Sequence, residues 1–210
     1  IYGIMNLKVE NSFVNYFKDD SEIKQGLLTI DQDLGGTIPL EIIINFQDKS
    51  SKASSLSDFE NEFEEEFNAL EQQDSYWFDS QKLRIAEKIH TYLANKEYIG
   101  SILSLHSLSM LVGSLGLGAN DFTIAFLYKN SPQNLKNQLF TPYANIAKNQ
   151  MRFVFRTFDS NPNLKRNLFI HEIQNDLTTL LQNESVTFKI NGMMVLYNNL
   201  LQSLIASQVD

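Results

Sequence analysis

The sequence predicts an α+β fold in which helices cover one face of an antiparallel sheet. Segments with apolar residues at every second position, which indicate strands, alternate with segments whose apolar residues recur at every third or fourth position, which indicate helices. Gly, Pro and Asn mark the connections between these segments. With 210 residues, 43% of them hydrophobic, the chain can bury a core without disulfides.

The first predicted elements are a helix and a strand. Asp20 or Ser21 can cap the helix, and Gly35 and Gly36 can end it because glycine adopts the left-handed conformation. The strand spans 37–46, with Pro39 near its start. One face of this strand carries only apolar side chains: Ile38, Leu40, Ile42, Ile44 and Phe46.

Two helices and a second strand are expected after a polar loop at 50–57. The first of these helices places acidic side chains opposite an apolar stripe made of Leu56, Phe59, Phe63, Phe67 and Leu70. The second is capped by Asp79 and continues through Leu93. The strand is predicted over 98–105.

Short helices and loops are expected over 106–148, where 121–128 fits either a helix or a strand. A third strand follows, because Met151, Phe153 and Phe155 alternate with Arg152, Val154 and Arg156. Asn161 and Pro162 then favour the start of a helix that carries Phe169, Ile173, Leu177 and Leu180 on one face. A fourth strand is expected over 185–190.

A final helix is predicted from Met193 to about Gln208. It carries one apolar stripe that can pack on the domain: Met194, Tyr197, Leu201, Leu204 and Ile205.

The order of the elements, strand–helix–strand twice with an insert between, is that of a split βαβ pair. This is the ferredoxin-like plan, an antiparallel sheet with helices on one face. We expect Ile42, Ile44, Val186 and Phe188 to be buried under the helix at 162–183. The chain is predicted to be a single domain over 1–210, with a first βαβ half at 37–105, a helical insert at 106–148, a second half at 151–190 and a helix at 191–210.

Composition excludes several classes of function. The net charge of −8 argues against binding to nucleic acid or to an anionic membrane surface, because phosphates would be repelled. The absence of cysteine excludes disulfides, thiolate zinc sites, iron–sulfur clusters and cysteine nucleophiles. No stretch reaches the roughly 18 consecutive apolar residues of a membrane span. The chain begins and stops within amphipathic sequence, so we expect a segment of something longer.

The polar motifs favour structural roles. His90, His106 and His171 are isolated in the sequence, which is typical of surface or satisfied core histidines. The order of glycines over 113–118 is GxxGxG, and no phosphate-loop lysine accompanies it. The glutamates of 60–66 are expected to form a solvated helix face rather than a calcium site.

Two further motifs also have ordinary explanations. Arg152 and Arg156 share one strand face, where pairing with acidic neighbours is favoured over contact with an anionic headgroup. Asn183, Glu184 and Ser185 form a glycosylation sequon. We therefore predict no catalytic, cofactor-binding or metal-binding residue, and no enzyme.

Several stretches together resemble an extracytoplasmic loop of RND (resistance–nodulation–division) exporters. Their order and spacing resemble the MMPL-like branch, which is related to the Patched and sterol-sensing transporters. The stretches are Phe13–Phe17, Ile30–Glu41, Tyr76–Phe78, Ile89–Leu93, Ser101–Leu105, Arg152–Pro162 and Asn191–Leu204 with Ser207–Gln208. The entry and exit motifs favour the second large loop of such a protein, and the first remains an alternative.

This resemblance implies a periplasmic porter domain in a bacterial inner-membrane exporter. Such exporters have about a dozen membrane helices and two large loops with ferredoxin-like subdomains, through which proton-coupled motion drives lipid or hydrophobic substrates. The proton-relay carboxylates lie in the membrane helices, so no catalytic residue is carried over. The implied partners are the rest of the exporter and a hydrophobic substrate, and 191–210 would lead to the next span.

Two other classes of function stay open. The domain can be an interaction module that recruits a partner protein, or a free-standing enzyme. An apolar cleft between subdomains would favour the porter domain over the interaction module. If the chain joins two membrane spans, Ile1 and Asp210 should lie on one face of the domain.

Overall fold

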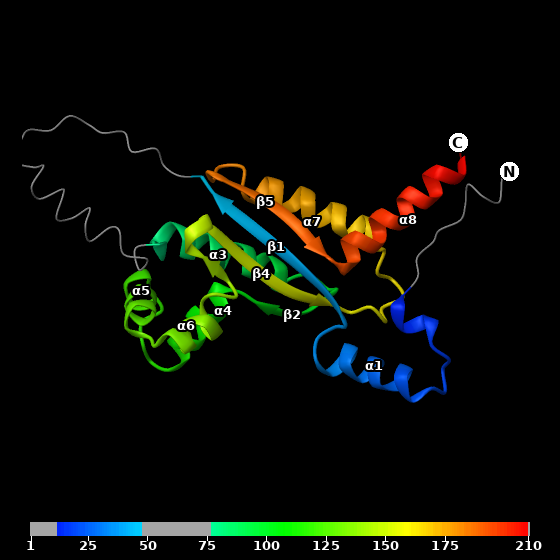
Figure 1. Cartoon of the computed structure of the whole chain (residues 1–210), viewed down its shortest axis with the longest axis horizontal. Helices are drawn as coiled ribbons and strands as arrows, with labels where there is room; N and C mark the ends of the chain where they lie inside the picture. Colours follow the sequence, from blue (N-terminus) through cyan, green and yellow to red (C-terminus); the bar gives the residue numbers. More distant parts are fainter. Residues whose placement is uncertain (1–11, 48–76, 210) are drawn as a thin grey trace, which may run out of the picture.

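The computed structural model describes residues 12–47 and 77–209 (Figure 1). Its helical elements are η2 (Phe13–Tyr16), α1 (Glu22–Asp33), α3 (Ser80–Ala94), α4 (Leu105–Ser114), α5 (Asp121–Asn130), α6 (Gln133–Leu139), η4 (Ile146–Lys148), α7 (Arg166–Leu180) and α8 (Met193–Val209). Its strands are β1 (Ile38–Phe46), β2 (Ile99–Leu103), β3 (Ala144–Asn145), β4 (Gln150–Thr157) and β5 (Val186–Gly192).

The strands form one open antiparallel sheet in the order β2-β4-β1-β5, and the short strand β3 pairs with β4. This confirms the predicted α+β class. Ile42 of β1 lies opposite Phe153 of β4 and Ile190 of β5, and Ile44 lies opposite Met151 and Phe188. The apolar positions of the three strands therefore share one face of the sheet.

That face of the sheet holds the core. Ile42, Ile44 and Phe153 are fully buried, in one apolar cluster with side chains of α3 and α7 such as Ile89 and Ile173. The predicted burial of Ile42 and Ile44 is confirmed. The predicted partners Val186 and Phe188 are only partly buried, although both pack against this cluster.

The opposite face of the sheet is polar. Arg152 forms an ion pair with Glu41 across β4 and β1 at 2.6 Å. Gln150 Nε2 donates to Asn45 Oδ1 at 2.7 Å. The expected pairing of Arg152 with an acidic neighbour is confirmed, whereas Arg156 is exposed.

Two predicted boundaries are wrong. The helix expected from Pro162 begins at Arg166, because Asn161 forms a local turn in which its Oδ1 accepts from the backbone N–H of Asn163 at 2.9 Å. The second strand ends at Leu103 because Ser104 is the N-cap of α4. The ambiguous segment 121–128 is helical, with Asn120 as its cap.

The final helix packs on the domain only at its start. Met194 is buried and Tyr197 is half-buried, but Leu204, which was expected on the packed stripe, is 57% exposed. Figure 1 shows α8 and α1 at one end of the long axis, with α5 and α6 at the other. The helix predicted over 56–70 and the two chain ends, Ile1 and Asp210, lie outside the described residues.

Candidate functional site

The beginnings of α3 and α5 meet at the end of the molecule that α5 and α6 form. Asp79 caps α3 by accepting from the backbone N–H of Lys82 at 2.7 Å, and Asn120 caps α5 in the same way through Thr123 at 2.8 Å. These caps fix where each helix begins. Residues from both helix starts line two hollows, which share Asp121.

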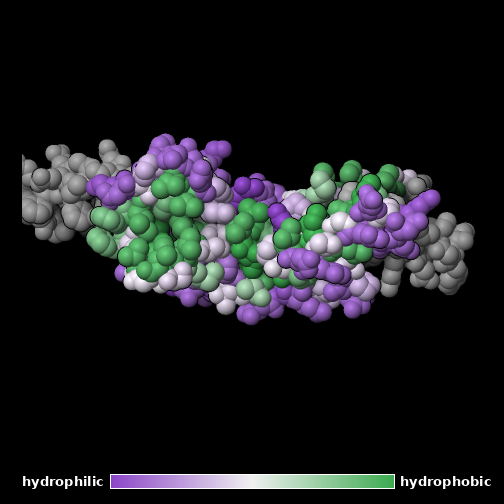
Figure 2. Space-filling view, turned by 90° about the horizontal axis from the view of Figure 1, so that it is seen from below, coloured by the Kyte–Doolittle hydropathy of each residue, from purple (hydrophilic) through white to green (hydrophobic). Residues whose placement is uncertain are grey.

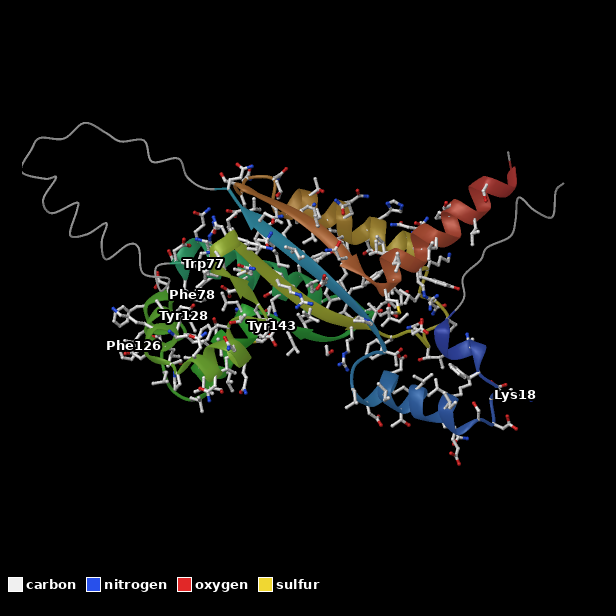
Figure 3. All side chains as sticks on the ribbon, in the orientation of Figure 1. Lys18, Trp77, Phe78, Phe126, Tyr128 and Tyr143 are labelled. Carbon is white, nitrogen blue, oxygen red and sulfur yellow. The ribbon has the colours of Figure 1, made fainter. Side chains whose placement is uncertain are left out.

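An aromatic cluster anchors this end of the molecule to the sheet (Figure 3). The ring of Phe78 is 4.9 Å from that of Tyr128 and 5.5 Å from that of Phe140, measured between centroids. The ring of Trp77 packs edge-on against Phe46 at 6.0 Å, and its Nε1 donates to Asn149 Oδ1 at 2.9 Å. Edge-to-face aromatic contacts of this kind hold α5 and α6 in a defined position.

The first hollow is apolar. Its volume is about 450 Å³, and its wall is formed mainly by Phe78, Phe122, Ala125 and Phe126. Phe122 and Phe126 stack on each other with their ring centroids 6.3 Å apart. Three charged residues, Asp79, Asp121 and Lys129, also line it. The aromatic part of this lining can accept an apolar group.

The second hollow is more polar and measures about 410 Å³. It lies between α3, which contributes Leu83 and Glu87, and α4, which contributes His106 and Met110. Asp121 joins it to the apolar hollow. We call the two hollows together the α5 groove, with the first as its apolar part and the second as its polar part.

Two histidines meet beside this groove. The rings of His90 and His106 lie 5.0 Å apart, and His90 Nδ1 is 2.9 Å from Ser104 Oγ. Burial lowers the pKa of His90 below its ordinary value of 6.5, and the charge that His106 can carry lowers it further. Burial also lowers the pKa of His106, and Glu87 offsets part of this effect.

A continuous run of sequence near the groove carries no charge. Residues 98–120 contain no Asp, Glu, Lys or Arg. Figure 2 shows an extensive apolar surface over the end of the molecule that contains α4, α5 and α6. Between α4 and α5 the large exposed apolar side chains are those of Met110, Leu111, Leu115, Leu117, Phe122 and Phe126. Such a patch is typical of a surface that contacts a ligand or a partner.

A separate buried polar cluster connects the start of the chain to the sheet. Asp31 at the end of α1 is fully buried and accepts from Thr37, Ser160 and the backbone N–H of Asp159 at 2.6–2.9 Å. Burial raises the pKa of Asp31, but these hydrogen bonds outweigh it and the pKa lies below 3.8. Asp159 accepts in turn from Ser12 Oγ at 2.8 Å and pairs with Arg166.

The other sequence candidates lie apart from the groove. His171 is exposed on α7. Gly113 lies in the last turn of α4, so 113–118 is the end of a helix and not a phosphate loop. Glu184 of the sequon accepts both guanidinium hydrogen bonds of Arg84, at 3.0 and 3.1 Å. The glutamates of 60–66 lie outside the described residues.

The sequence did not predict the groove. Its walls come from three helices, and 121–128 could not be assigned to a helix before the structure. The signal that could have indicated it is the uncharged run at 98–120, followed by Phe122 and Phe126.

Comparison with known proteins gives no further assignment. A scan against protein-family models, a search of curated proteins and a search of solved structures found no match to this chain. Over 12–47 and 77–209, no helix is long and apolar enough to cross a membrane. In the same part of the chain, no group of three or more His, Asp or Glu side chains could hold a metal ion.

Proposed function

We propose that this chain is a periplasmic porter domain of a proton-driven RND-type exporter in a bacterial inner membrane, and that it is not an enzyme. Its substrates would be lipids or other hydrophobic molecules. The observation that carries the proposal is the α5 groove, whose apolar hollow of about 450 Å³ opens beside an exposed apolar surface. A porter needs such a path, because its substrate must leave one apolar environment for another.

The fold supports the same proposal. We infer a ferredoxin-like arrangement with a helical insert between β2 and β4, because the strand order β2-β4-β1-β5 places two βαβ units, β1-α3-β2 and β4-α7-β5, in one antiparallel sheet. Two of the stretches that resemble RND loops, Ile30–Glu41 and Arg152–Pro162, also contact each other in the structure. Asp31, next to Gly35 and Gly36, accepts hydrogen bonds from Asp159 and Ser160.

A second proposal is an interaction module that recruits a partner protein. The observation that favours it is the number of large apolar side chains exposed on α4, α5 and α8, among them Leu115, Phe122 and Leu196. Interface cores are depleted in charge, as residues 98–120 are. In this case the α5 groove would be part of a protein contact and would not hold a small molecule.

The experiment measures binding of a neutral apolar fluorophore, N-phenyl-1-naphthylamine, to the purified chain. We expect saturable binding that the double variant Phe122→Ser, Phe126→Ser weakens at least about tenfold, since two rings of the wall are lost. The matched control is Leu168→Ser, which removes an equally exposed apolar side chain from α7.

Mass spectrometry of organic extracts then identifies molecules that copurify with the wild-type chain and not with the double variant. Absence of saturable binding in the wild-type chain, or equal binding by all three proteins, would exclude the groove as a substrate path. Capture of a protein through the same residues, without fluorophore binding, would favour the interaction module.

A further inference from the structure

Two histidines, the buried His90 and the half-buried His106, lie side by side where α3 contacts α4. His90 lies on the buried face of α3, and His106 lies in the first turn of α4. Their rings are 5.0 Å apart, and His90 Nδ1 is 2.9 Å from the hydroxyl of Ser104. Because Ser104 is the N-cap of α4, the pair lies at the point where this helix begins.

The hydroxyl of Ser104 contacts both His90 and the backbone of Ser107. Its oxygen accepts from the backbone N–H of Ser107 at 3.4 Å, and Ser107 Oγ accepts from the N–H of Ser104 at 3.1 Å, which completes a capping box. With neutral His90, the Ser104 hydroxyl can donate to Nδ1 and still accept from Ser107. Protonated His90 carries a hydrogen on Nδ1, so the fully buried hydroxyl must direct its own hydrogen elsewhere.

The position of His106 also opposes protonation. The first turn of a helix presents unpaired N–H groups, so a positive charge there is unfavourable. A charge on both rings 5.0 Å apart would add direct repulsion. Burial lowers the pKa of each histidine below 6.5.

Few charged side chains on α3 and α4 can stabilise a positive charge on the histidine pair. Glu87 on α3 acts on His106. Arg84 of the same helix lines the polar hollow with His106 but is held by Glu184, and Lys88 donates to the carbonyl of Leu180. The remaining wall, α4 and β2, lies within the uncharged run at 98–120.

The other elements around the histidine pair contribute few charged groups. Asp121 of α5 reaches the polar hollow that His106 lines. Arg152 and Arg156 of β4 alternate with the buried positions of that strand and belong to the opposite face of the sheet. The environment therefore favours two neutral rings at neutral pH.

We propose that His90 and His106 form a proton-sensitive latch, which holds α4 on α3 while both rings are neutral and releases the start of α4 when they are protonated. Release changes the polar hollow, because His106 and Met110 of α4 form one wall of it. The claim that this latch regulates ligand binding rests on the proposed function. The claim that it controls the contact between α3 and α4 does not rest on that function.

The test titrates the three histidines of the ¹⁵N-labelled chain by NMR from about pH 8 to about pH 5, around the ordinary histidine pKa. Hydrogen exchange of the backbone amides is followed in parallel. We expect His90 and His106 to take up protons below pH 6.5. The amides of α4 should lose protection over the same range, while those of α7 keep it.

Two variants make the test specific. In His106→Gln the repulsion from the second ring is absent, so the pKa of His90 should rise and the loss of α4 protection should shift with it. His171→Gln, which removes the exposed histidine of α7, is the matched control and should leave both readings unchanged. An unchanged titration of His90 in His106→Gln, or full α4 protection after both rings are protonated, would overturn the latch.

Fluorophore binding measured over the same pH range separates the two proposals. If the two histidines titrate as expected but the chain does not bind the fluorophore at any pH, the proposed substrate path is excluded and the latch is still supported. Binding that is saturable but independent of pH removes the latch as a regulator and leaves the substrate path.

Discussion

Asp31 is the residue on which the attachment of α1 depends. Its carboxylate is fully buried and is met by five donors, two each from Thr37 and Ser160 and one from Asp159. A buried carboxylate is stable only when its oxygens are fully hydrogen-bonded, and this one is. The residue therefore joins the end of α1, the approach to β1 and the loop after β4.

The substitution Asp31→Asn tests this role. An amide has a single acceptor oxygen, so part of the donor set loses its partner, and we expect a loss of about 2–4 kcal/mol in the free energy of unfolding. Asp33→Asn is the matched control, because Asp33 is exposed on the same helix. Urea unfolding measures both variants, and an equal stability of the two would show that the donor set does not depend on the charge.

The same residue predicts a dependence on pH. The pKa of Asp31 is lowered in the folded chain, so the unfolded chain binds a proton more readily. Its stabilisation is complete above the unfolded value of about 3.8 and is lost as the pH falls through the lower, folded value. The wild-type melting temperature should fall in this acid range, and the fall should be smaller in Asp31→Asn.

Ile43 and Ile44 are neighbours that face opposite sides of the sheet. Ile44 is fully buried between Met151 and Phe188, whereas Ile43 lies in register with Arg152 and Lys189. We expect Ile44→Asp to cost about 4 kcal/mol or more, because it buries an unpaired charge. Ile43→Asp should cost much less, because two basic side chains flank it. Thermal unfolding of the two variants tests which side chains of β1 face the core. Equal losses of stability would contradict this assignment.

Among the elements, the connection from α1 to β1 is the most tightly constrained. Gly36 has φ of +106°, and a Cβ atom there would lie 2.4 Å from the backbone oxygen of Thr157. Gly36→Ala should therefore destabilise the chain by at least about 2 kcal/mol. Gly26→Ala is the matched control within α1, where nothing lies within 4 Å, and it should stabilise by about 0.5–1 kcal/mol. Guanidinium unfolding of both variants should give opposite signs.

Local patterns predicted most of the elements, and long-range contacts account for what they missed. Asp79 and the alternation in 38–46 act through neighbouring residues, so α3 and β1 were predicted correctly. The start of α7 was missed because Asn161 can also form a turn, and here its Oδ1 accepts from the N–H of Asn163, while Arg166 at the start of α7 pairs with Asp159. His90 and His106 meet only because Ser104 turns the chain from β2 into α4.

At the scale of the whole molecule, the two ends differ in what they expose. The end formed by α4, α5 and α6 presents the α5 groove and an extensive apolar surface. The opposite end presents α8, which is buried at Met194 and exposes Leu196, Leu200 and Leu204 on one side. These three side chains therefore form an apolar stripe of α8 that lies outside the domain core.

Substitutions can distinguish the exposed leucines of α8 from its buried Met194. Replacing Leu196, Leu200 and Leu204 together by Gln should leave the melting temperature of the chain nearly unchanged, because each side chain is 55–62% exposed and glutamine has a helix propensity close to that of leucine. Met194→Gln should instead cost about 2–3 kcal/mol, since it places an amide in the core. A loss of stability in the triple variant as large as that of Met194→Gln would mean that the stripe already packs within the domain, and that α8 offers no free surface to a partner.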